Sequence, residues 1–148
     1  IFQNGKSAAE LVMDFAFIYV DFFLNDRELF RIMMTFMLHT EDMNLAETVN
    51  QHIIEVTNNT VKIIETILQQ GIEKGEFPSD INLRLSRNAM WGLLNGIISL
   101  HLFTGKEAHK EERIRSAVKA SLDIFINGLR RYKKSDEMIN QNINFQTI

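Results

Sequence analysis

The sequence contains no cysteine, only one proline, and no excess of positive charge. The absence of cysteine excludes disulfide frameworks and cysteine-ligated zinc or iron–sulfur sites, and it fits a reducing cytoplasm. One proline and seven glycines in 148 residues indicate long, uninterrupted helices. A net charge of −3 does not favour binding to nucleic acid through bulk charge.

Long hydrophobic runs are also missing. The most apolar N-terminal run, from Leu11 to Leu24, is too short for a membrane span and contains Asp14 and Asp21. No basic segment precedes it, so it does not have the pattern of a signal peptide. We therefore expect no membrane partner and a cytoplasmic location. Because the chain starts at Ile1 and not at methionine, we expect a fragment of a longer protein or a processed chain.

Hydrophobic periodicity predicts an all-α domain of five main helices. A chain of 148 residues is long enough to bury its own core as one domain. We assign residues 1–134 to this domain and the polar, non-periodic residues 135–148 to a C-terminal extension. The helices are expected at Ser7 to Leu24, Asp26 to His39, Leu45 to Lys74, Ile81 to Phe103 and Ala108 to Lys133.

Residues with capping propensity mark the ends of these helices. A capping box, in which two residues three apart satisfy each other's free amides, is expected at the first helix. Gly75 is a natural left-handed C-cap for the third helix, and Gly105 ends the fourth. The expected N-caps are Ser7 with Glu10, Asn25 with Glu28, Asn44 with Glu47, and Ser79 or Asp80.

The stretch from Ala89 to Gly105 has no charged residue up to Thr104 and carries the only tryptophan. A helix that is apolar around most of its circumference must be covered on more than one side. Its glycines, Gly92 and Gly96, are expected where another helix or a ligand comes close to the backbone. On a helical wheel, Gly92, Asn95 and Ser99 lie beside Trp91, and Leu93, Ile97 and Leu100 lie on the other side. We assign the first set to a pocket or close helix crossing and the second to a partner subunit.

No pattern of catalytic residues is present in the sequence. It has no glycine-rich phosphate loop, nucleophile elbow or zinc-protease motif. A di-iron bundle needs Glu-x-x-His pairs, whereas His52 and Glu55 have the reversed order. We interpret the histidines as satisfied or exposed side chains. The sequence therefore predicts a binding module and not an enzyme, with no catalytic residue, no metal and no cofactor.

Three groups of residues admit two interpretations each. Asp14 and Asp21 share a helix face, which is either a solvated edge or a pair of carboxylates facing a cationic ligand. The polar run 57–60 is either an orienting spot in a pocket or an exposed turn. The methionines of the second helix suit either plain core or a surface that repacks around ligands.

Several local features follow one another in a characteristic order. An aromatic-rich pair of helices is followed by a long helix ending in Gly-Ile-Glu-Lys-Gly-Glu-Phe, from Gly71 to Phe77, and then by Asp80. The next helix carries Trp-Gly-Leu-Leu-Asn-Gly-Ile, from Trp91 to Ile97. The last ends in Phe-Ile-Asn-Gly-Leu, from Phe125 to Leu129. Over Ser7 to Arg131 this order resembles the C-terminal regulatory domain of TetR-family transcriptional repressors. The helix-turn-helix of that family is missing and would lie upstream of Ile1.

The resemblance implies an effector pocket between the first four helices and a homodimer in which the last two helices form a four-helix bundle with those of a second chain. It also implies release of DNA on effector binding, with DNA held only through an N-terminal domain outside this chain. The lining suggests an apolar or amphipathic effector. The expected pocket residues are Phe15, Tyr19, Phe22, Met33, Met37, Ile54, Thr57, Asn58, Trp91 and Asn95. The expected dimer residues are Leu93, Ile97, Leu100, Leu122, Phe125 and Leu129.

Two other classes of protein remain open at this point. A helical adaptor would bind a partner protein in the groove beside the fourth helix. A small helical-bundle enzyme or metal carrier would depend on His52.

Overall fold

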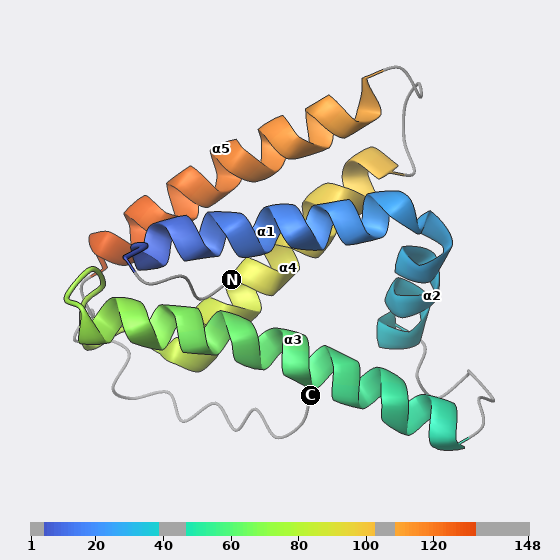
Figure 1. The fold of residues 1–148 in the computed structure, drawn as a ribbon, viewed down its shortest axis with the longest axis horizontal. Coiled ribbons are helices and arrows are strands. Elements are labelled where there is room, and N and C mark those ends of the chain that lie inside the picture. Colours follow the sequence, from blue (N-terminus) through green and yellow to red (C-terminus); the bar gives the residue numbers. More distant parts are fainter. Residues whose placement is uncertain (1–4, 39–46, 103–108, 133–148) are drawn as a thin grey trace.

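The structure, a computed structural model, describes residues 5–38, 47–102 and 109–132. Every regular element in these ranges is a helix, which confirms the predicted all-α fold of five helices (Figure 1). The helices are α1 (Ala8–Asn25), α2 (Arg27–Leu38), α3 (Glu47–Glu73), α4 (Leu83–Leu102) and α5 (Lys110–Arg130).

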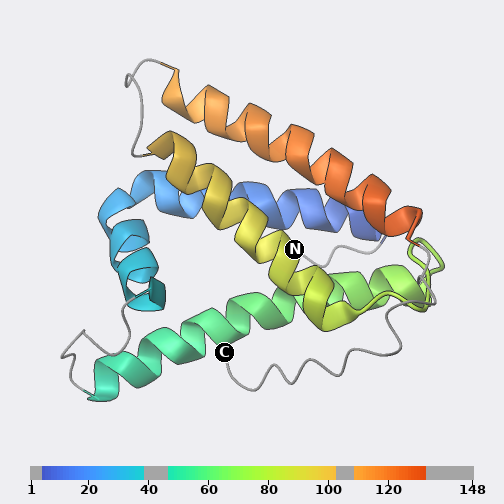
Figure 2. The ribbon, with the colours of Figure 1, turned by 180° about the vertical axis from the view of Figure 1, so that it is seen from behind.

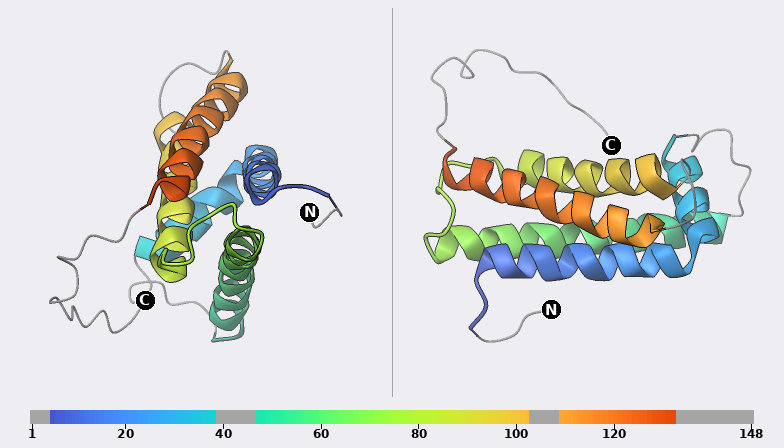
Figure 3. Two further views of the ribbon diagram at one scale, coloured as in Figure 1. Left: turned by 90° about the vertical axis from the view of Figure 1, so that its left-hand side faces the viewer. Right: turned by 90° about the horizontal axis from the view of Figure 1, so that it is seen from above.

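The helices form two layers. Helices α1 and α3 lie side by side in one layer, and α4 and α5 in the other (Figure 3). Contacts between α3 and α4 and between α1 and α5 close these four helices into a bundle. Helix α2 turns away from the end of α1 and runs across one end of the bundle toward α3 (Figures 1 and 2). One apolar core fills the bundle; its largest fully buried side chains include Phe30, Leu11, Ile64, Ile67, Leu68, Met90, Leu94, Ile98, Ile114 and Leu122.

Helix α1 starts at the capping box that its sequence predicts. The Glu10 backbone N–H donates to the Ser7 hydroxyl at 3.2 Å, and the Ser7 backbone N–H donates to the Glu10 carboxylate at 2.8 Å. These two bonds satisfy amides that a helix leaves free at its N-terminus. The Ser7 backbone and hydroxyl groups also lower the pKa of Glu10. The apolar stripe of α1 then faces the core, from Leu11 to Phe23.

Two other predicted caps are wrong. Helix α1 continues through Asn25, so Asp26 takes the capping place of α2 and accepts the Leu29 N–H at 2.9 Å. Helix α4 begins at Leu83, later than expected, so Asn82 caps it by accepting the Leu85 N–H at 3.1 Å. The cap predicted at Asn44, the stop at Gly105 and the extension 135–148 lie outside the described residues.

The end of α3 is fastened to the start of α1. Gly75 has φ +71°, which confirms the predicted left-handed cap. The Glu76 carboxylate accepts the backbone N–H groups of Ala8 at 2.8 Å and Ala9 at 3.4 Å. Gly71 lies at the centre of this junction, where Phe77 and Ala8 leave no room for a side chain on it. We call these residues, Ala8, Gly71, Glu76 and Phe77, the α1–α3 junction.

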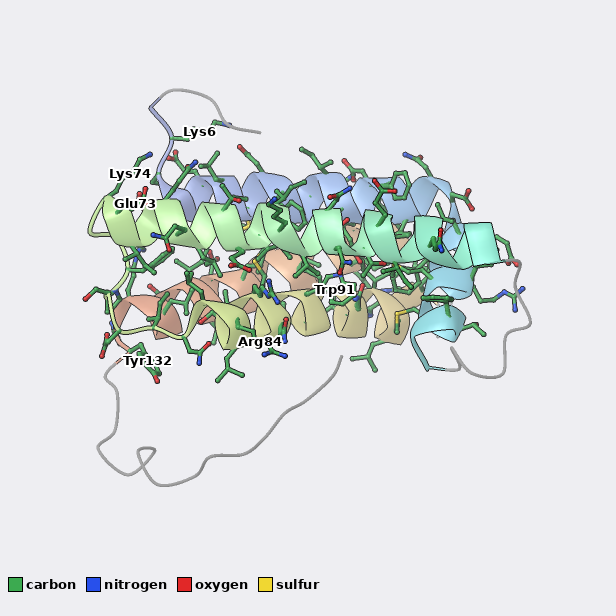
Figure 4. All side chains as sticks on the ribbon, turned by 90° about the horizontal axis from the view of Figure 1, so that it is seen from below. Lys6, Glu73, Lys74, Arg84, Trp91 and Tyr132 are labelled. Atoms are coloured by element: carbon green, nitrogen blue, oxygen red, sulfur yellow. The ribbon has the colours of Figure 1, made fainter. Side chains whose placement is uncertain are left out.

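A further contact holds the approach to this junction from outside. The Lys74 ammonium donates to the backbone carbonyl of Lys6 at 3.1 Å. Figure 4 shows Lys6 and Lys74 together at the same end of the molecule. Two residues just after the end of α3 therefore hold the start of α1. Lys74 binds the Lys6 carbonyl just before the helix, and Glu76 binds the first two amides of the helix.

Candidate functional site

A buried polar cluster links α1 to α4. The Tyr19 hydroxyl lies 2.7 Å from the Asn95 side-chain oxygen, and the Trp91 indole N–H donates to that hydroxyl at 3.1 Å. The Met33 sulfur, from α2, lies 3.9 Å from the same hydroxyl. Trp91 is labelled in Figure 4, where it lies between α3 and α4. Two helices, α1 and α4, therefore bring one tyrosine, one tryptophan and one asparagine together beside the apolar core, and α2 adds the Met33 sulfur. We call Tyr19, Trp91 and Asn95 the polar cluster.

The hydrogen bonds of this cluster run in one direction. An indole N–H can only donate, so the Tyr19 oxygen accepts from Trp91. The Tyr19 proton is then free to be donated to Asn95, and 2.7 Å is a typical O–H···O length. The Met33 thioether is a weaker acceptor at a longer distance and does not compete. The Asn95 oxygen is consequently fixed toward Tyr19, and its amino group points away from the hydroxyl.

Aromatic rings surround the tyrosine on its own helix. Phe15 stacks on Tyr19 with ring centroids 5.9 Å apart, and Phe23 meets it edge-on at 4.9 Å. Burial raises the pKa of Tyr19 to about 12, although the hydrogen bonds with Trp91 and Asn95 partly oppose the shift. The hydroxyl therefore remains protonated, as a donor, at any physiological pH.

This pKa shift predicts that the protein loses stability in strong alkali. The pKa of Tyr19 lies above its ordinary value of 10.0, so its contribution is complete below pH 10 and is lost as the pH rises toward 12. We expect the free energy of unfolding of the wild type to fall by roughly 2 kcal/mol more than that of Tyr19→Phe over this range. Urea unfolding at a series of pH values measures the difference. Tyr132→Phe is the matched control, and equal slopes for wild type and Tyr19→Phe would contradict the shift.

The remaining expected pocket residues lie in different environments. Phe15 is buried beside Tyr19, and Met33 is half-buried against the core. Phe22 is 54% exposed, and Ile54 and Asn58 are also exposed in the single chain. In the polar run 57–60, Thr57 and Thr60 are half-buried, and the two asparagines between them are exposed. The Met37 side chain lies outside the described residues. The structure thus brings together Phe15, Tyr19, Met33, Trp91 and Asn95, and it does not bring Phe22, Ile54 or Asn58 into that group.

The expected dimer residues also divide into two groups. Leu122 is 0% exposed, and Leu129 is buried too, so both pack inside the core of a single chain. Leu93, Ile97 and Phe125 are half-buried, and Leu100 is 66% exposed. Sequence reasoning missed Ile124, which is 75% exposed on α5 and is the most exposed of the large hydrophobic side chains described. The available signal was an isoleucine two positions from both Leu122 and Ile126, which places it on the side of α5 opposite the buried stripe.

The predicted polar strip of α4 is divided as well. Asn95 faces the core, whereas Gly92 and Gly96 are exposed, and a Cβ built on either glycine would meet nothing within 4 Å. The same is true of Gly128 on α5. Packing within one chain therefore gives no reason for glycine at these three positions.

The charged residues considered for a ligand are engaged with other side chains. Asp14 pairs with Lys6 at 2.6 Å, and Asp21 pairs with Arg115 of α5. Both carboxylates therefore act as partly exposed ion-pair partners at the edge of α1. A polar surface hollow of about 520 Å³ lies around the start of α5 and includes Arg115, the partner of Asp21. It is lined by Arg27, His109, Lys110, Glu111, Glu112 and Arg115, and so shares no residue with the polar cluster.

Two searches of the described residues bear on other classes of site. Among the side chains described, no group of three or more histidine, aspartate and glutamate residues is placed to hold a metal ion. Within the same ranges, no helix combines the length and hydropathy needed to cross a membrane.

A family model described as YsiA-like protein, C-terminal region, matches residues 24–126. The match covers well over half of the 148 residues. Together with the five-helix fold, it defines the class of this protein as a C-terminal regulatory region of a TetR-type regulator. Within that class, the chain belongs to the YsiA-like family. Neither the curated proteins nor the solved structures contain a significant match.

Proposed function

We propose that this chain is the effector-binding and dimerisation domain of a cytoplasmic TetR-like repressor. Its effector is an apolar or amphipathic small molecule, and effector binding releases DNA. DNA is held through an N-terminal helix-turn-helix domain outside this chain, and the domain itself catalyses no reaction. Membership of the family supports the regulatory role, and the features below support the finer assignments.

The observation that carries the effector assignment is the polar cluster in its apolar setting. Ligand sites in proteins are mostly apolar, with a few polar groups that fix the orientation of the ligand. Here aromatic side chains and a methionine supply the apolar area, and Tyr19, Trp91 and Asn95 supply the polar groups. Met33 suits the lining of a ligand pocket, because its unbranched thioether chain is flexible and can adapt to the shape of the ligand.

The dimer assignment is supported by the outer face of the α4–α5 layer. Gly92, Gly96 and Leu100 of α4 are exposed, as are Ile124 and Gly128 of α5. Small residues beside large apolar ones allow two helix pairs to approach closely, and a twofold-symmetric interface uses the same patch on both chains. We therefore centre the interface on this exposed face, with Leu93, Ile97 and Phe125 at its inner edge. Leu122 and Leu129 pack in the core beneath this face and hold α5 in position for the interface.

Helix α4 provides the link between effector and dimer. Asn95 and Trp91 lie on its inner side, and Gly92, Gly96 and Leu100 lie on its outer side. An effector that shifts α4 therefore shifts the two subunits relative to each other. Recognition helices must be about one DNA turn apart to occupy both half-sites, so such a shift weakens DNA binding. A coupling of about 1–3 kcal/mol is sufficient for a useful switch.

Native mass spectrometry of the purified chain tests this function directly. We expect the mass of a homodimer at low micromolar concentration, with a small organic molecule retained and released on gentle activation. An apo chain that binds one defined protein with fixed stoichiometry would instead support an adaptor. Stoichiometric metal that is lost on changing His52 would support a helical-bundle enzyme or metal carrier. A monodisperse monomer by light scattering would contradict the dimer.

A further inference from the structure

The amino group of Asn95 has no hydrogen-bond partner among the described residues. The side chain is only 4% exposed, so water in the bulk solvent does not satisfy it. An unsatisfied buried donor destabilises the folded protein, and proteins rarely retain one without a reason. The direction of hydrogen bonding explains why the amino group has no partner. Trp91 donates to the Tyr19 hydroxyl, and Tyr19 in turn donates to the Asn95 oxygen and not to its nitrogen.

The side chains hydrogen-bonded in the polar cluster are neutral. Tyr19 stays protonated, because burial raises its pKa to about 12, and Trp91 carries no charge. Arg87, which precedes Asn95 on α4 by about two helical turns, pairs with Glu65 of α3. An anionic group beside Asn95 would therefore lose its water shell without gaining a countercharge, which is costly in a buried site.

We propose that Asn95 Nδ2 donates a hydrogen bond to an uncharged carbonyl oxygen of the effector, so that the pocket selects ketone-, ester- or amide-type ligands over hydrocarbons of the same shape. This inference rests on the proposed effector-binding function and specifies the ligand chemistry. The Trp91–Tyr19–Asn95 chain holds the amide in its donating orientation. Access to the amide requires side chains near it to move, and Met33 lies at the α2 side of the cluster.

A set of naphthalene probes isolates the carbonyl group. Acetylnaphthalene and ethylnaphthalene have nearly the same shape and differ in one carbonyl oxygen, and naphthoate replaces the ketone with a carboxylate. Dissociation constants for the purified chain are measured by fluorescence and by calorimetry. We expect wild type to prefer the acetyl probe over the ethyl probe, and the ratio of the two constants to fall about tenfold in Asn95→Leu.

Asn88→Leu is the matched control, because Asn88 is an exposed asparagine one heptad earlier on the same helix. Its acetyl-to-ethyl ratio should equal that of wild type. Nuclear magnetic resonance of the wild type gives a direct readout that does not depend on a variant. In protein labelled with ¹⁵N-asparagine, the side-chain resonances of Asn95 should shift on addition of acetylnaphthalene and not on addition of ethylnaphthalene. These resonances are identified by their loss in Asn95→Leu.

The outcomes separate this inference from the proposed function. Equal binding of the acetyl and ethyl probes, or an unchanged ratio in Asn95→Leu, overturns the role of Asn95 while leaving the effector pocket in place. Preferred binding of naphthoate overturns the uncharged acceptor. Binding of no probe up to its solubility limit counts against the effector pocket itself, and the inference falls with it.

Discussion

Replacing Gly71 with alanine is expected to destabilise the protein by about 1–3 kcal/mol. A Cβ on Gly71 would lie 2.3 and 2.4 Å from two ring carbons of Phe77 and 2.8 Å from the Ala8 Cβ. Neither neighbour can give way freely, because the Phe77 N–H donates to the Gly71 carbonyl at 3.2 Å and the Ala8 N–H is held by Glu76. Urea unfolding followed by circular dichroism measures the loss, and Glu76 should lose its contact with α1 at the same time.

Three other glycines provide the control for this substitution. A Cβ on Gly92, Gly96 or Gly128 meets nothing within 4 Å. Alanine has a higher helix propensity than glycine by up to about 1 kcal/mol, so these variants should leave the isolated subunit as stable as wild type or more stable. A Gly71→Ala protein as stable as these three would show that the junction is not close-packed.

Placing glutamate at position 124 is expected to convert the homodimer into a folded monomer. Ile124 is 75% exposed in the single chain, so Ile124→Glu should leave the free energy of unfolding of one subunit within about 0.5 kcal/mol of wild type. In the dimer, symmetry places two such carboxylates in one apolar interface. Burying unpaired charge there should raise the dissociation constant by about a hundredfold or more. Light scattering combined with sedimentation measures the constant.

Thr66→Glu controls for the added charge, since Thr66 is exposed on α3 in the other layer of the bundle. That variant should remain dimeric. Leu100→Glu, at a position 66% exposed on α4, should repeat the effect of Ile124→Glu. A dimer that survives both Ile124→Glu and Leu100→Glu would show that the chains associate through another face.

Local features of this fold were predictable because they depend on a few neighbouring residues. The Ser7–Glu10 capping box and the left-handed Gly75 were both predicted and both confirmed. The caps at Asp26 and Asn82 were missed, because each lies one to three residues from an equally good capping residue. Sequence propensity does not decide between such neighbours, since the choice depends on where the preceding segment packs.

Long-range features were predictable only in part. Tyr19, Trp91 and Asn95 were grouped because of their residue types, but the direction of their hydrogen bonds needs the relative placement of α1 and α4. Leu122 and Leu129 illustrate the opposite difficulty. The period of α5 identifies an apolar face, and that face fits a core as well as it fits a subunit interface. Only the position of α1 against α5 resolves it in favour of the core.

The carboxylate of Glu76 has a further consequence for the order in which the chain folds. Its bonds to Ala8 and Ala9 join residues 68 and 67 positions apart, whereas α4 and α5 are neighbours in sequence. Closing the longer loop costs more chain entropy, so we expect the α4–α5 pair to form first and α1 to dock afterwards. Contacts made after the folding barrier mainly slow unfolding. We therefore expect the α1–α3 junction to set the lifetime of the folded state, and we expect its loss to let the first helix detach before the rest of the bundle unfolds.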